Sequence, residues 1–406
     1  MQYMQTTLSN GLRIVHYPVR SAVSYCGFAV HAGSRDESAA LFGMAHFTEH
    51  MLFKGTAKRR SHHILNRMES VGGELNAYTS KEETIVYAVS MNEHTQRACE
   101  LLCDLVTSSK FPEKEIEKEV DVILDEINSY KDNPPELIYD EFENALFAGH
   151  DLGHNILGEP ETLEAFTPEM GQAFLRRWYH PQNMVFFSVG STPFDKIVHY
   201  VERSFQWNST TFETPLRLAA TVSQPFTRLD QQDTHQSHVL IGNAAFDVHD
   251  KRRIHLSLLN NILGGPGMNS LLNVSLREKR GLVYHVESNY TPYTDTGVFN
   301  IYFGTDPTKR QKCIDLVHKE MKKLRDTALT SIQLTRAKNQ IRGQMGISAD
   351  NKENIAMGLA KSYLHHGRYD SLEHAYHKID AITAADLQEA AQLIFDPNHL
   401  STLIYE

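Results

Sequence analysis

The order of the expected helices and strands predicts an α+β protein with two similar domains. Short strand-forming runs come as hairpins between helical stretches, which favours mainly antiparallel sheets covered by helices on one face. The same order of elements occurs twice along the 406 residues, which indicates a divergent internal duplication. A polar stretch separates the two halves. We therefore expect domains at 1–208 and 225–406, joined by a linker at 209–224.

The first half begins as strand, Asn10-Gly11 turn and strand. Residues 44–53 are expected to form an apolar helix. After it we expect a helix before Gly72, a hairpin from Tyr78 to Ser90, and a helix from Glu93 to Ser108.

The second half repeats this pattern. Its expected elements are a helix ending near Arg280, strands at Leu282–Tyr290 and Gly297–Phe303, a helix at Pro307–Leu324, and a largely helical region at Ser331–His366. Gly367 would cap the end of that region.

The bulk composition excludes several classes of protein. The chain is 41% hydrophobic and 22% charged, with a formal net charge of −10, which argues against nucleic acid as a partner. No run of about 18 apolar residues is present, so we expect no membrane span. The N-terminus lacks a basic and apolar leader, which favours the cytoplasm. The cysteines have neither disulfide nor zinc spacing, and we expect core thiols at Cys26, Cys99, Cys103 and Cys313.

The run from His46 to His50, His-Phe-Thr-Glu-His, carries the clearest functional signal. On a helix, residues i and i+4 lie one above the other, so His46 and His50 can hold one metal ion with Glu49 beside them. The order H-x-x-E-H is the inverzincin pattern. Apolar flanks indicate a buried helix, in which a carboxylate needs a partner or a metal. A core helix in which the three side chains bond to one another is the alternative that the motif leaves open.

A catalytic zinc needs a third protein ligand and an open position for water. The stretch Phe111–Lys131 has helical apolar spacing, and Glu119 and Glu126 fall about 60–80° from the middle of its apolar face. Asp125 points about 180° away from that face and should be solvated, so Glu126 is the better ligand. An ordinary charged helix flank is the alternative that helical geometry alone leaves open.

These residues and their surroundings resemble the pitrilysin and insulin-degrading-enzyme family of inverted zincins, within it the short-subunit branch that includes mitochondrial processing peptidase. In that family a glutamate follows H-x-x-E-H by about 75–78 residues, and 126 − 50 = 76 selects Glu126. A second family glutamate lies seven residues earlier, here Glu119, and the resemblance implies that it orients a histidine ligand. Other matching segments are GSRDE at 33–37, MLFKGT at 51–56, GGELNAYTS at 72–80 and YHPQNM at 179–184.

The segment Leu276–Tyr284 carries a second set of family residues. From the residues alone it is a charged helix end, a glycine stop and a strand start, with an ordinary surface arginine. In the family, an arginine and a tyrosine at this spacing (284 − 277 = 7) face the zinc across a clamshell and bind the substrate backbone. Arg277 and Tyr284 occupy those places. The resemblance thus implies a homodimer in which half-clamshells close around a chamber, with this pair of one chain facing the zinc of the other.

The resemblance also implies how peptides bind and react. The segment Gly72–Ser80 resembles the edge strand that receives substrate by strand addition, so Asn76 and Ala77 would contact the peptide. One Zn²⁺ per chain would lower the pKa of its water toward about 7. Glu49 would accept that proton and pass it to the leaving amine. We therefore expect a zinc-dependent endopeptidase acting on peptides or unfolded segments in an enclosed chamber.

A non-catalytic core or scaffold subunit of the same fold is the competing class, because some relatives keep the architecture and have lost the chemistry. The complete ligand set favours the enzyme. A metal-storing or sensing protein gains no support from the scattered spacing of the other histidines. We expect structural or surface roles for the pairs His62/His63, His150/His154, His235/His238 and His365/His366.

Overall fold

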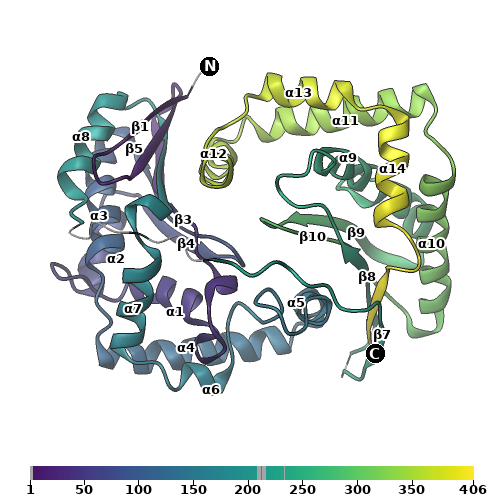
Figure 1. The fold of residues 1–406 in the computed structure, drawn as a ribbon, viewed down its shortest axis with the longest axis horizontal. Coiled ribbons are helices and arrows are strands. Elements are labelled where there is room, and N and C mark those ends of the chain that lie inside the picture. The colour runs from purple at the N-terminus through teal and green to yellow at the C-terminus, as the bar shows by residue number, and fades with distance from the viewer. Residues whose placement is uncertain (1–2, 208–211, 213–215, 233) are drawn as a thin grey trace. The chain divides into compact units, whose positions relative to one another are not determined.

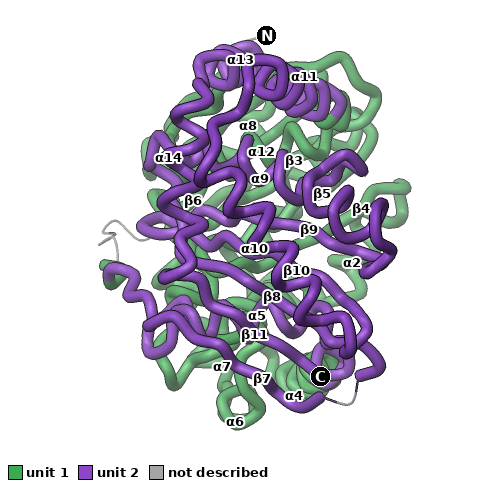
Figure 2. The backbone as a smooth tube through the Cα atoms, turned by 90° about the vertical axis from the view of Figure 1, so that its right-hand side faces the viewer, with its two compact units in different colours: residues 1–127, 154–218, 348–371 green, residues 128–153, 219–347, 372–406 purple. Residues whose placement is uncertain are grey.

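The computed structural model describes residues 3–207, 212, 216–232 and 234–406. The chain forms two compact units, each built around one sheet (Figures 1 and 2). Unit 1 contains residues 1–127, 154–218 and 348–371, and unit 2 contains residues 128–153, 219–347 and 372–406. The predicted α+β class with antiparallel-dominated sheets and helices is confirmed.

The elements of unit 1 are β1 (Met4–Thr7), β2 (Arg13–Pro18), β3 (Val23–Val30), α1 (Met44–Leu52), α2 (Ser61–Glu69), β4 (Glu74–Thr79), β5 (Thr84–Met91), α3 (Thr95–Ser108), α4 (Glu113–Lys131, which runs into unit 2), α6 (Pro160–Leu163), α7 (Pro168–Trp178), β6 (Met184–Gly190), α8 (Phe194–Ser204) and α12 (Lys352–His366). Short 3₁₀ turns lie at Ser34–Asp36, Ala39–Leu41, Asn92–His94 and Pro181–Asn183.

The elements of unit 2 are α5 (Pro134–Leu146), β7 (Thr227–Asp230), β8 (Ser237–Ala244), α9 (Arg253–Gly264), the π-helical turn η5 (Asn273–Glu278), β9 (Val283–Pro292), β10 (Gly297–Thr305), a 3₁₀ turn at Pro307–Lys309, α10 (Arg310–Asp326), α11 (Ser331–Ser348), α13 (Leu372–Ala381), α14 (Ala384–Ile394) and β11 (Ser401–Tyr405).

The two sheets have the same internal order. Unit 1 has β1-β2-β6-β3-β5-β4 and unit 2 has β7-β11-β8-β10-β9, so the orders match strand for strand once β1 is set aside. One pair in each sheet is parallel, β2–β6 and β7–β11, and the other pairs are antiparallel. This correspondence supports the internal duplication predicted from the order of elements.

Among the described elements, one helix also covers the second face of each sheet. In unit 1, α12 packs on β2, β3 and β6, where its buried apolar residues meet those of the strands: Ala356, Leu359 and Ala360 against Val15, Ala29 and Val185. In unit 2, α5 packs on β8 and β11, with Ile138 and Phe142 against Leu240 and Leu403. The helix in each case comes from the other half of the sequence. The compact units therefore differ from the continuous halves 1–208 and 225–406, because the apolar faces of 348–371 and 128–153 are buried on the opposite sheets.

Part of the expected linker, 209–211 and 213–215, lies outside the described residues, and the chain from 216 to 226 has neither helix nor strand. The four cysteines are buried and unpaired, as predicted. Over the described ranges, no helix is both long and apolar enough to cross a bilayer.

Candidate metal centre and active site

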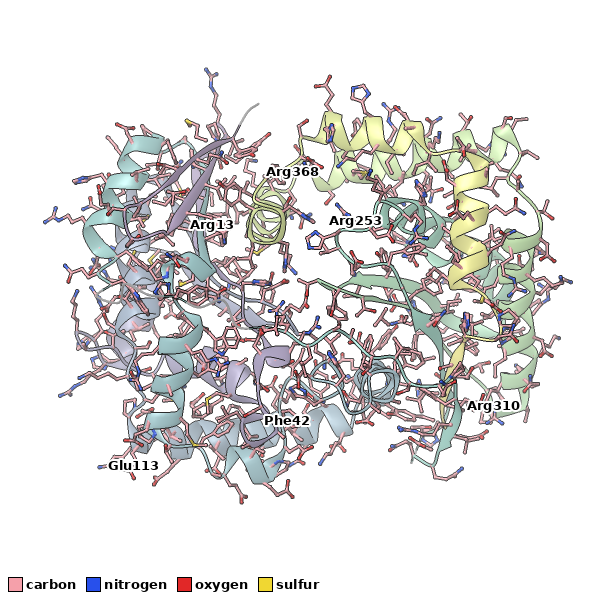
Figure 3. The ribbon with its side chains drawn as sticks, viewed as in Figure 1. Arg13, Phe42, Glu113, Arg253, Arg310 and Arg368 are labelled. Atoms are coloured by element: carbon pink, nitrogen blue, oxygen red, sulfur yellow. The ribbon has the colours of Figure 1, made fainter. Side chains whose placement is uncertain are left out.

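The H-x-x-E-H motif lies on α1, and the start of this helix is built for close packing. Gly43 precedes it with φ of 94°, in the left-handed region that favours glycine. The buried carboxylate of Glu37 accepts hydrogen bonds from the backbone N–H groups of Gly43 (2.8 Å) and Ala45 (2.6 Å). These N–H groups at the start of the helix have no acceptor within the helix itself. His154 Nε2 lies 3.1 Å from the same carboxylate. Its ring stacks at 3.8 Å on Phe42, which is labelled in Figure 3.

Three potential metal ligands converge beside α1. Oε2 of Glu126, on α4, lies 3.8 Å from Nε2 of His46 and 3.9 Å from Nε2 of His50. Two atoms that each bind zinc at about 2.0–2.1 Å in tetrahedral geometry stand about 3.3 Å apart, so small side-chain adjustments bring this set onto one ion. The neighbouring Asp125 is exposed. The donor set, two imidazoles and a carboxylate with no fourth protein ligand among the described residues, fits a catalytic rather than a structural zinc.

The protonation of His46 also suits a metal ligand. Burial, together with the neighbouring His50, lowers the pKa of His46 to about 3. The imidazole is therefore neutral at physiological pH, which is the form that binds a metal.

Glu119 fixes the orientation of His50. Its Oε2 lies 3.0 Å from Nδ1 of His50, and its Oε1 lies 2.5 Å from Nζ of Lys54. Burial alone would raise the pKa of Glu119, but the hydrogen bonds with His50 and Lys54 outweigh burial and hold this pKa below its usual value. A carboxylate on Nδ1 makes that nitrogen the donor and leaves the lone pair of Nε2 toward Glu126. In the described part of the chain, Nδ1 of His46 has no corresponding partner.

Glu49 lies beside the two histidines and is bound by a residue of the adjacent sheet. The Oγ1 hydroxyl of Thr79, the last residue of β4, donates to Oε2 of Glu49 over 2.7 Å. Burial raises the pKa of Glu49 above its ordinary value, although the Thr79 hydrogen bond and the proximity of His50 oppose this. A carboxyl with a raised pKa is suited to exchange protons near neutral pH.

The strand β4 forms one edge of the first sheet and pairs with β5 alone among the described strands. Tyr78 faces α12, since Nζ of Lys361 lies 5.2 Å from the centre of its ring. Alternation along the strand places Ala77 and Thr79 on the face toward α1, and Asn76 on the face with Tyr78. Asn76 is exposed and Ala77 half-buried, and neither side chain is large. The backbone groups along this edge of β4 are therefore open to an added strand.

The structure divides the predicted site residues between the two units. The ligands, Glu49, Glu119 and β4 belong to unit 1, whereas Arg277 and Tyr284 belong to unit 2. Arg277 lies on η5, and its guanidinium carbon is 5.7 Å from the ring centre of Tyr284 on the edge strand β9. Tyr284 is 85% exposed, and both residues line a cavity of about 490 Å³. The pair is thus accessible to a ligand within its own unit.

The sequence alone does not predict three contacts of the site: Glu37 with the start of α1, Lys54 with Glu119, and Thr79 with Glu49. All three residues lie in the segments GSRDE, MLFKGT and GGELNAYTS that carry the family resemblance. The family resemblance of these segments points to the residues, but no spacing rule indicates which side chain each residue contacts.

Comparisons with known proteins identify the family of this chain. Residues 15–160 match the family described as insulinase (peptidase family M16), and residues 165–341 match the family described as peptidase M16 inactive domain. An uncharacterized zinc protease of Bacillus subtilis is 31% identical over 401 residues, which cover 98% of this chain and 97% of the relative. An uncharacterized zinc protease of Streptomyces coelicolor is 32% identical, over 96% of this chain and 86% of the relative.

Two solved structures share the fold. A protease from Helicobacter pylori superposes with a TM-score of 0.91 at 22% identity, over 100% of this chain and 99% of that one. A structure named peptidase M16 inactive domain, from Pseudomonas fluorescens, superposes with a TM-score of 0.92 at 20% identity, over 100% and 98%. At these identities the likeness shows a common fold.

Proposed function

This chain belongs to the insulinase-like peptidase family M16, and from that premise we propose that it is a zinc-dependent endopeptidase. His46, His50 and Glu126 would hold one Zn²⁺, and the observation that carries the proposal is that ligand atoms of all three lie within 4.8 Å of one another. The zinc protease names of its relatives support the same metal and the same class of reaction. The sequence motifs further favour the short-subunit branch of the family, the branch that includes mitochondrial processing peptidase.

Each side chain of the site has a distinct part in peptide hydrolysis. A bound zinc supplies Lewis acidity, which lowers the pKa of water toward about 7 and polarises a carbonyl. Glu49 accepts a proton from the attacking water and delivers it to the leaving amine. Glu119 holds the proton of His50 on Nδ1, so that Nε2 stays free to bind the metal.

Substrates would bind as an added strand on the free edge of β4, next to Asn76 and Ala77. Pairing of backbone groups carries little sequence preference, so we propose peptides or unfolded polypeptide segments as substrates. Arg277 and Tyr284 would bind the substrate backbone and help stabilise the tetrahedral intermediate. In the proposed cytoplasmic homodimer, this pair from one chain acts at the zinc of the other and the chains enclose a chamber.

A non-catalytic scaffold subunit is the second candidate, because one matching family is described as an inactive domain. That match covers 165–341, whereas the ligands lie in the region that matches the insulinase family. The complete ligand set therefore favours the peptidase.

Elemental analysis of the purified protein, combined with a mass-spectrometric cleavage map of a mixed peptide library, separates the two functions. We expect one zinc per chain and cleavage that stops when a chelator removes the metal. Protein that binds no zinc, or that leaves the whole library intact with zinc bound, would be a scaffold.

A further inference from the structure

The hydroxyl of Thr79 makes a directed hydrogen bond to Glu49. Thr84, the cross-strand partner of Thr79, lies 3.4 Å from this hydroxyl and donates its own proton to the carbonyl of Ala32 over 2.9 Å. A hydroxyl has one proton to donate, and the 2.7 Å contact with Glu49 is much the shorter. Glu49 thus receives its bond from the strand that is proposed to receive the peptide.

The turn that follows Thr79 is charged and nevertheless buried. Lys81, Glu82 and Glu83 are only 4%, 4% and 7% exposed, although such residues are rarely buried unless they are paired. All three have partners within unit 1: Glu82 with Arg35 at 2.7 Å, Glu83 with Lys361 at 2.8 Å and His365 at 2.7 Å, and Lys81 with the carbonyl of His154. Breaking one buried pair would leave an uncompensated charge, so these contacts hold the turn in one arrangement.

Backbone hydrogen bonds also hold this turn. The N–H groups of Ser34 and Arg35 donate to the carbonyls of Ser80 (3.1 Å) and Lys81 (2.8 Å). A Cβ atom on Gly33 would lie 2.2 Å from the Ser80 oxygen, so this approach requires glycine. The turn therefore presents Thr79 to α1 at a fixed position.

We infer from these contacts that Thr79 is a positioning residue for the proposed reaction. Its hydroxyl holds the Glu49 carboxylate in the orientation that accepts a proton, and it ties this base to the strand on which the peptide adds. The inference rests on the proposed general-base role of Glu49. Without the hydroxyl, the carboxylate is free to rotate, and a displacement of about 1 Å at a reacting group can cost about 100-fold in rate.

The test compares Thr79→Val, which keeps the shape of the side chain and removes the hydroxyl, with Thr79→Ser, which restores it. With a fluorogenic peptide, we expect kcat of Thr79→Val to fall by about 10–100-fold, while KM and the zinc content stay near those of the parent. Thr79→Ser should recover most of the activity. Thr107→Val is the matched control, since Thr107 donates its hydroxyl proton to the Cys103 carbonyl within α3, away from Glu49.

Several outcomes would overturn the inference. A kcat of Thr79→Val within about twofold of the parent, or a Thr79→Ser variant as slow as Thr79→Val, would show that the hydroxyl does not position the base. Loss of zinc from Thr79→Val would assign Thr79 to metal binding instead. If Thr79→Val does not fold, Thr79→Ala provides the same readouts. Full activity in Glu49→Gln would be a separate failure, that of the proposed function itself.

Discussion

Glu119 allows a graded test of the proposed metal site. In Glu119→Gln the amide oxygen can still accept the hydrogen bond from Nδ1 of His50, but the charge that pairs with Lys54 is gone. In Glu119→Ala both interactions are lost. Loss of such a partner of a ligating histidine typically weakens metal binding by about 10–100-fold, or about 1.4–2.8 kcal/mol. We expect Glu119→Gln near the lower end of this range and Glu119→Ala near the upper end.

Competition for zinc with a chromogenic chelator measures the affinity of each variant directly. Glu117→Gln is the matched control, because Glu117 is exposed on the same helix and should leave the affinity unchanged. Thermal unfolding of the metal-free proteins separates metal binding from stability. If both Glu119 variants bound zinc within about twofold of the parent, the proposed role of Glu119 would be wrong.

Three further predictions concern the ligands, acid stability and the dimer. Glu126→Gln should lose or weaken zinc binding in elemental analysis whereas Asp125→Asn keeps it, because Asp125 is exposed; the reverse would move the ligand by one residue. Burial lowers the pKa of His16 to about 4. Below about pH 6.5 the unfolded chain therefore binds a proton at His16 that the folded chain does not. This difference lowers the free energy of unfolding by about 3 kcal/mol as the pH falls to 4. Urea unfolding should then show a shallower acid slope for His16→Gln, and equal slopes would contradict this. Mixing Glu49→Gln with Arg277→Ala subunits should restore part of the peptidase activity if dimers share sites, and no recovery in exchanged dimers would mean that each chain acts alone.

Local patterns were sufficient to predict the helix α1 and which of its side chains gather at the candidate metal site. His46, Glu49 and His50 follow from the spacing of one helical turn, and helical angles separated Glu126 from the exposed Asp125. These features depend on residues within a few positions of one another, where the periodicity of a helix determines the geometry.

Contacts between distant segments could not be predicted in the same way. Thr79 meets Glu49 across 30 positions of sequence, through the packing of an edge strand on a helix. The pattern of α12 indicates a helix, but an apolar helix face does not specify which sheet it covers. For this reason the composition of the compact units, with 348–371 in unit 1 and 128–153 in unit 2, differs from a division at the linker.

The exchange of α5 and α12 between the sequence halves affects how this protein can be cut and engineered. A fragment ending near residue 218 would lack α12 and would expose Val15, Ala29 and Val185 to water. The complementary fragment would lack α5 and leave Leu240 and Leu403 uncovered. Neither piece should express as a soluble truncation, and successful reconstitution would require both pieces to fold in each other's presence.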